Sequence, residues 1–122
     1  MELVPILRQG DVLIISIMTA LSDKDILHLQ NRVLDKTCKS GVTGVVVDVS
    51  ALDVIDSFSS KTIIDMAHAV RLLGAQTVVV GIQPEVALAM VLLGLTISDV
   101  PTALDLDLGI ALLKEGRPHA AE

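Results

Sequence analysis

Short β-branched runs alternate with segments of helical periodicity along this chain, and this alternation constrains its fold more than any other feature. Strand-like runs are expected at 12–17, 44–49 and 77–81, and helical patterns at 22–41, 57–73 and 84–94. Strands that alternate with helices in this way typically form a parallel sheet covered by helices. No low-complexity linker interrupts the 122 residues, so we predict one α/β domain over residues 1–115 and a flexible tail at 116–122.

The beginning of the chain modifies this picture. Two short strands are expected around 4–7 and 12–17, joined by the turn Gln9-Gly10-Asp11, and so short a connection makes the pair antiparallel. A short edge segment at 102–104 and a last helix at 105–115 complete the pattern. The sequence therefore predicts a small, mixed, mostly parallel β-sheet with about four α-helices.

The third helical segment is unusual in its lack of polar residues. Val86-Ala-Leu-Ala-Met-Val-Leu-Leu93 is apolar on every face, and a helix of that kind is expected to be buried on every side. In a small domain the sheet contacts only one side of it. The other side is expected to pack against the terminal helix of the same chain or against a partner chain, and the sequence leaves both possibilities open.

Composition argues against several classes of partner. The net charge is −6 and Phe58 is the sole aromatic residue, whereas binding to DNA, RNA or anionic lipid depends on a positive field and bases favour aromatic platforms. We therefore expect neither a nucleic-acid partner nor a membrane. The single cysteine, Cys38, can form no internal disulfide, and the first residues lack the features of a signal peptide. These features predict a cytoplasmic protein.

Catalytic motifs are scarce. The three histidines lie far apart without the spacing of a metal site, no glycine-rich phosphate loop precedes a helix, and no Gly-x-Ser-x-Gly elbow occurs. We expect no catalytic residue, no cofactor and no metal. One alternative is a phospho-acceptor aspartate site in which Asp48, Asp53 and Asp56 hold Mg²⁺. The absence of an acidic pair after the first two strands, and of a lysine after the last, argues against it.

The segment Asp53-Val-Ile-Asp-Ser-Phe-Ser-Ser-Lys61 carries the clearest functional signal. It lies where the buried run Val45–Val49 gives way to a helix, a position at which open α/β sheets present functional groups. Asp56 or Ser57 alone would cap that helix, yet Ser59 and Ser60 follow where better helix formers would be expected. A phosphate on Ser57 would lie against the positive end of the helix. The pattern predicts a phosphorylation switch.

Three motifs together resemble the STAS domain family. They are Asp56-Ser57 after the buried strand, Gly81-Ile-Gln-Pro-Glu-Val-Ala87 after the next strand, and Thr102-Ala-Leu-Asp-Leu-Asp107 near the end. The Gly-Ile-Gln-Pro segment points to the single-domain scaffold and antagonist branch found in the stressosome. This resemblance implies a protein without enzymatic activity that binds a switch kinase and is phosphorylated by it on Ser57. Many STAS antagonists carry Asp-Ser-Ser-Gly at this turn, and the departure here leaves Ser59 and Ser60 as alternative acceptors.

The resemblance also implies partners. They are a switch serine/threonine kinase of the RsbT type, a STAS co-scaffold protein of the RsbR type and a phosphatase of the RsbX type, with homo- and hetero-oligomers expected. The residues expected to bind partners around the switch are Asp23, Asp53, Asp56, Phe58 and Lys61. An alternative function is a stand-alone STAS-like domain that binds a small anionic ligand or nucleotide at the same strand-to-helix turn.

Overall fold

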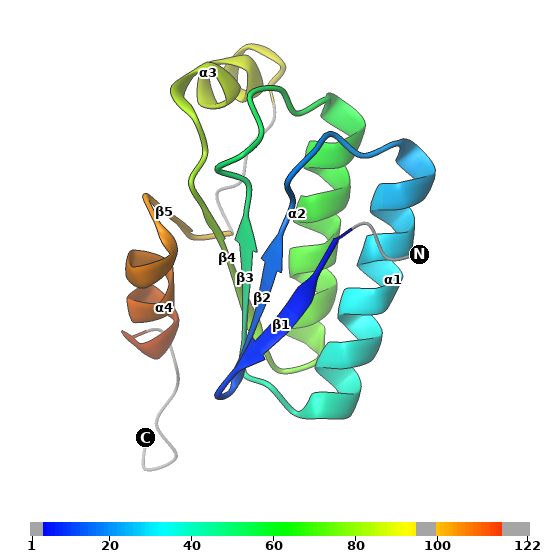
Figure 1. Ribbon diagram of the computed structural model, residues 1–122, viewed down its shortest axis with the longest axis vertical. Helices are drawn as coiled ribbons and strands as arrows, with labels where there is room; N and C mark the ends of the chain where they lie inside the picture. Colours follow the sequence, from blue (N-terminus) through cyan, green and yellow to red (C-terminus); the bar gives the residue numbers. More distant parts are fainter. Residues whose placement is uncertain (1–3, 95–99, 116–122) are drawn as a thin grey trace.

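A five-stranded sheet forms the centre of the protein, in a computed structural model that describes residues 4–94 and 100–115. The strands are ordered β1-β2-β3-β4-β5, with β1 antiparallel to β2 and the remaining neighbours parallel (Figure 1). The predicted mixed, mostly parallel sheet is confirmed. The strands are β1 Ile6–Gln9, β2 Val12–Ser16, β3 Gly44–Asp48, β4 Gln76–Val80 and β5 Thr102–Ala103.

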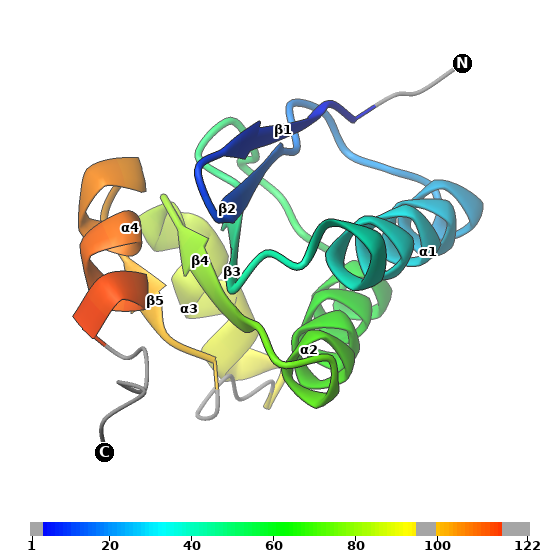
Figure 2. The ribbon, with the colours of Figure 1, turned by 90° about the horizontal axis from the view of Figure 1, so that it is seen from below.

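Helices lie on both faces of this sheet. The described helices are α1 Asp23–Ser40, α2 Ser57–Leu72, α3 Pro84–Leu92 and α4 Leu106–Glu115. Helices α1 and α2 pack side by side on one face and α4 covers the other (Figure 2). Helix α3 lies at the end of the sheet where the parallel strands finish, the end at which α1 and α2 begin (Figure 1).

Strand β3 is buried on both faces because its side chains alternate between two hydrophobic clusters. Val45 and Val47 belong to the cluster that includes residues of α1 and α2, whereas Val46 belongs to the cluster that includes Leu113 of α4. This explains the run of valines that the sequence shows at 45–47, since a strand covered on both faces has no position for a polar side chain. Because β3 is packed on both faces, the sheet fixes the point at which the loop from β3 to α2 begins.

The glycine at position 109 allows α4 to lie close to the sheet. A Cβ atom added there would meet the Val80 Cγ1 atom at 2.5 Å, well inside any real contact. Helix α4 therefore packs closely on β4, on a face of the sheet and away from α3. The expected short final helix is confirmed, beginning at Leu106 rather than at Asp105, while the predicted tail at 116–122 lies outside the described residues.

The expectation that the third helix is buried on every side is wrong for the folded chain. Only Val86 and Met90 of α3 are buried, while Leu88, Val91 and Leu92 are exposed. The terminal helix does not cover them, because α4 packs on a face of the sheet and α3 lies at the sheet's end (Figure 1). Of the two possibilities that the sequence left open, cover by the terminal helix is therefore excluded.

Candidate functional site

The N-terminus of α2 is capped by a residue other than Ser57. Asp56 adopts an extended backbone and its Oδ1 atom accepts a hydrogen bond from the Ser59 backbone N–H at 2.7 Å. The Asp56 carbonyl accepts the first helical hydrogen bond, from Ser60, at 3.0 Å. Ser57 is the first residue of the helix and is exposed. The sequence allowed either residue to be the cap; the structure assigns that role to Asp56, so the Ser57 hydroxyl is not needed there.

The three serines of this turn differ in accessibility. Ser57 is exposed, Ser59 is half-buried, and Ser60 is 3% exposed with its Oγ atom sealed from solvent and without a hydrogen-bond partner. A kinase must bring the γ-phosphate of ATP to the hydroxyl oxygen, so the folded protein does not present Ser60 to such an enzyme. Ser57 is the serine with the greatest access at this turn, and Ser59 is the second.

The loop that carries the site is anchored at its beginning. The Asp48 Oδ1 atom accepts a hydrogen bond from the Ser50 N–H at 2.9 Å, and the Ser50 carbonyl accepts one from the Gln83 side-chain amide at 2.8 Å. Gly81 approaches the same serine so closely that a Cβ atom there would lie 2.6 Å from the Ser50 Cβ atom. The Gly81-Ile-Gln-Pro84 segment therefore packs against the loop between β3 and α2. This contact was not predicted from the sequence.

The five residues expected to bind partners all lie on the surface. Asp53, Asp56, Phe58 and Lys61 surround the start of α2, and Asp23 is the first residue of the neighbouring α1. Lys61 is engaged by Asp65 one turn further along α2, with Nζ and Oδ2 3.1 Å apart. The exposed carboxylates of Asp53 and Asp56 thus lie close to Ser57 in the chain, while the nearby Lys61 is paired with Asp65. The binding role of these residues stays a prediction.

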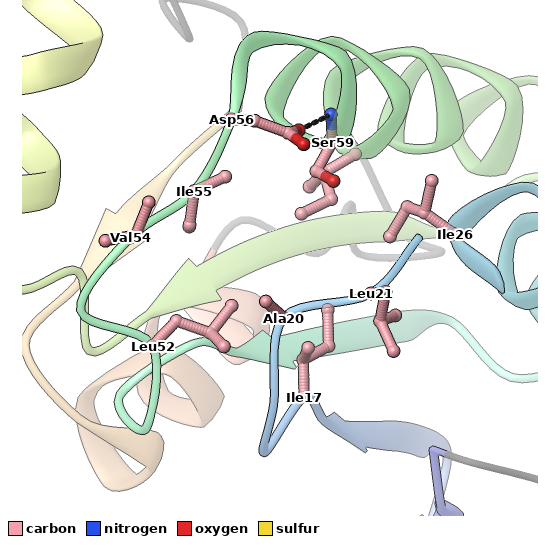
Figure 3. A pocket seen from close by; sticks show the side chains of 10 residues that line it. Ile17, Ala20, Leu21, Ile26, Leu52, Val54, Ile55, Asp56 and Ser59 are labelled. Carbon is pink, nitrogen blue, oxygen red and sulfur yellow. Dashed lines mark hydrogen bonds between the residues drawn. The ribbon is translucent and has the colours of Figure 1, made fainter. Parts of the chain in front are cut away.

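A small apolar pocket of about 80 Å³ lies beside Asp56, between the beginnings of α1 and α2 (Figure 3). Its walls come from the end of β2, from the loop before α2 and from both helices, and its polar lining includes Asp56 and Ser59. We did not predict this pocket. The signal for it was the apolar sequence Leu52, Val54 and Ile55 in a loop that otherwise reads as polar.

The structure does not support an aspartate site that holds Mg²⁺. Within residues 4–94 and 100–115, no group of three histidine, cysteine, aspartate or glutamate side chains is placed to hold a metal ion. Asp48 instead bonds to the backbone of the following turn. Across the same residues, no helix is both long and apolar enough to span a lipid bilayer.

These features coincide with a known family of domains. The sequence profile of the STAS domain matches residues 4–107, which includes the sheet, the capped start of α2 and the Gly81-Ile-Gln-Pro84 segment. The chain belongs to the STAS domain family.

Within that family the chain is similar to proteins of the stressosome. RsbS from Moorella thermoacetica, in a variant with one serine replaced by glutamate, superposes with a TM-score of 0.81 at 33% identity over 92% of this chain and 95% of that one. A chain from a structure of the stressosome gives 0.79 at 33% identity, over 91% and 96%. The resemblance to the stressosome branch of the STAS family, predicted from the sequence, is confirmed.

A third similarity is to a larger protein. The RsbT co-antagonist protein RsbRA from Bacillus subtilis is 34% identical over 83 residues, which is 68% of this chain and 30% of that protein. This chain thus spans less than a third of the length of RsbRA, and its likeness concerns the shared domain alone.

Proposed function

We propose that this protein is a non-catalytic scaffold and antagonist of stress signalling that assembles with related STAS proteins, holds a serine/threonine switch kinase, and releases it when Ser57 is phosphorylated. The observation that carries the proposal is the start of α2. There Asp56 caps the helix and leaves the exposed Ser57 hydroxyl outside the cap. The likeness to RsbS and to a stressosome chain supports the scaffold role.

The partners follow from the relatives. RsbRA is called a co-antagonist of RsbT, and we extend this to a kinase of the RsbT type as the protein held by this chain. An RsbR-type protein is the co-scaffold and an RsbX-type phosphatase reverses the modification. The exposed Phe58 side chain, next to the switch, is the proposed apolar contact for the kinase, because aromatic side chains contribute more than most to the centre of an interface.

The mechanism we propose is electrostatic. A phosphoserine adds about −1.5 to −2 charge at neutral pH to a protein whose net charge is already −6. Within the protein, the N–H groups at the start of α2 stabilise that charge, so the fold tolerates it. Outside, it adds to the exposed carboxylates of Asp53 and Asp56. An acidic kinase surface, or one that buries this turn, then loses affinity.

Phosphate mapping by mass spectrometry tests the proposal. The purified protein is incubated with ATP and an RsbT-type kinase, and the modified peptide is sequenced. We expect one phosphate on Ser57, absent from Ser57→Ala and retained in Ser59→Ala, which is the matched control from the same turn. The Ser57→Ala protein should also keep the kinase bound after ATP is added. Release of kinase from Ser57→Ala as readily as from the wild type would contradict the mechanism.

The alternative of a small anionic ligand receives little support from the pocket at this turn. Its lining is mainly apolar and its charged member is the carboxylate of Asp56, which repels an anion. A ligand bound only by the folded state would raise the melting temperature, and the rise would increase with the logarithm of the ligand concentration. A nucleotide that produces such a shift, and fails to do so with Ser57→Glu, would favour this alternative over the scaffold.

A further inference from the structure

Helix α2 differs from the other described helices in the charge of its first turn. Helices α1, α3 and α4 each carry at least one acidic residue there, namely Asp23 and Asp25, Glu85, and Asp107, whereas α2 has none. Negative charge in the first turn stabilises a helix because it lies near the free N–H groups and the positive end of the dipole. In α2 that turn holds serines, and the first charged side chain within the helix is Lys61. A phosphate on Ser57 would supply the charge that this turn lacks.

Lys61 lies within reach of such a phosphate. It follows Ser57 by four residues, and the Cβ atoms of residues at this spacing lie about 5–6 Å apart on one side of a helix. The Cα–Cβ bond of a helical residue is tilted towards the N-terminus, so the side chain of Lys61 starts in the direction of Ser57. Its stem is flexible, and the side chain is 71% exposed. The ammonium group can therefore reach a phosphate on Ser57 without a change in the backbone.

The present partner of Lys61 holds it weakly. The Nζ atom lies 3.1 Å from the Asp65 Oδ2 atom, and both side chains are more than half exposed, so the pair contributes little to stability. The lysine also precedes the acid, which is the less favourable order for residues four apart on a helix. In α1, the pair of Asp35 and Lys39 has the same distance of 3.1 Å but the favourable order. A phosphate on Ser57 would offer Lys61 that favourable order with about −1.5 to −2 charge.

We propose that Lys61 receives the phosphate of phosphorylated Ser57: its ammonium group leaves Asp65 and pairs with the phosphate, one turn nearer the start of α2. This inference rests on the proposed phosphorylation of Ser57 and specifies the residue that responds to it. The ammonium group offsets the repulsion between the phosphate and the carboxylate of Asp56, which keeps its hydrogen bond to the Ser59 N–H group.

The exchange extends the effect of the phosphate along α2. Asp65 loses its ion pair with Lys61, so negative charge is uncovered there as well as added at Ser57. The two positions are eight residues apart, which corresponds to about 12 Å along a helix. A kinase that contacts the first three turns of α2 would therefore meet a change in charge over that whole length.

The neighbouring elements carry other ionisable groups. Helix α1 packs against α2, and its first two turns hold the ionisable side chains of Asp23, Lys24, Asp25 and His28. Strand β4, which α2 also contacts, has no ionisable side chain. Lys24 lies between two acids in the sequence. His28 titrates in the same pH range as a phosphoserine, so titrations must be compared between variants that all retain it.

Phosphorus NMR of protein with phosphoserine at position 57 tests the pairing. The phosphoserine is incorporated during synthesis of the chain, so the test needs no kinase. A nearby ammonium group favours the doubly charged phosphate. We therefore expect Lys61→Gln to raise the second pKa of the phosphate, by an amount that corresponds to about a twofold increase in proton affinity. Lys61→Arg should retain the wild-type pKa, and Asp65→Asn should lower it, because the lysine is then free to pair with the phosphate.

The matched control is Lys39→Gln. It removes the same charge from an ion pair of the same length near the end of α1, and its phosphate should titrate as in the wild type. Lys24→Gln tests the cation of the neighbouring helix in the same way. The proposal is overturned if Lys61→Gln titrates as the wild type, or if either control raises the pKa as much as Lys61→Gln does, with circular dichroism showing that each variant is folded.

The outcomes separate this inference from the proposed switch. Phosphorylation of Ser57 by an RsbT-type kinase is measured separately, on protein made without phosphoserine. A titration that depends on Lys61, in a protein that the kinase does not modify on Ser57, supports the pairing and contradicts the switch. A titration that is independent of Lys61, in a protein that the kinase does modify on Ser57, contradicts the pairing and supports the switch.

Discussion

At the scale of single residues, the serines at the start of α2 have distinct physical roles. Ser57 is exposed at the first helical position, whereas Ser60 points into the domain with an unpaired hydroxyl. Helical periodicity accounts for the difference, because Ser60 shares a face with the buried residues Ile63 and Ala67. A buried hydroxyl without a partner loses its hydrogen bonds to water on folding and gains none in return.

This arrangement predicts that Ser60→Ala stabilises the protein. We expect the free energy of unfolding in urea to rise by about 1 kcal/mol relative to Ser59→Ala, because the alanine removes an unsatisfied buried group. Ser59→Ala is the matched control, since both changes bring the same gain in helix propensity within the same turn. A Ser60→Ala protein that is less stable than Ser59→Ala would show that the hydroxyl has a partner in solution, such as a buried water.

At the scale of elements, the site depends on a contact between two loops. The loop after β4 holds the loop after β3 through the Gln83 side chain and through the close approach of Gly81 to Ser50. Gly81 also has a φ angle of +78°, in the left-handed region that favours glycine. The Gly-Ile-Gln-Pro motif thus has a structural reason, since it fixes the segment that leads from β3 to Ser57.

Replacement of Gly81 by alanine should destabilise the fold more than the same change at Gly74. Both glycines have positive φ angles, but only Gly81 has another residue within contact distance of the added Cβ atom. We expect about 1–2 kcal/mol from backbone strain in Gly74→Ala, and an additional loss of at least about 1 kcal/mol in Gly81→Ala from the clash with Ser50. Equal unfolding free energies for the two variants would mean that the loops separate at little cost.

Sequence periodicity and turn residues were sufficient to place the elements but not to place the loops. The alternation of apolar runs predicted the mixed sheet, and the boundaries of the helices and strands differ from those expected by at most two residues. The exposure of α3 was not predicted, because the hydrophobicity of a helix indicates that it should be buried but does not indicate where the helix lies in the fold. The contact of Gly81 with Ser50 and the pocket beside Asp56 were not predicted, because each joins segments about thirty residues apart. A single sequence does not show which distant segments lie in contact.

At the scale of the whole molecule, charge and apolar surface are separated. The exposed carboxylates of Asp53 and Asp56 lie at the start of α2, whereas the exposed side chains of Leu88, Val91 and Leu92 on α3 are apolar. Under the proposed mechanism, a phosphate on Ser57 adds charge to the start of α2 in a protein whose net charge is already −6, and this lowers the affinity for the kinase.

This separation predicts a salt-dependent switch. The affinity of the kinase, held in its ADP-bound form to prevent turnover, is measured for unphosphorylated and Ser57-phosphorylated protein at low and high salt. The screening length falls from about 10 Å at 0.1 M salt to about 3 Å at 1 M, so the ratio of the two dissociation constants should decrease by about threefold or more. Ser57→Asp, with less charge than a phosphate, should show a smaller ratio at low salt. If the ratio of the two dissociation constants is the same at both salt concentrations, the phosphate acts through local contacts, by blocking the turn sterically. The electrostatic mechanism would then be wrong, and the phosphate would instead exclude the kinase from the surface around Phe58.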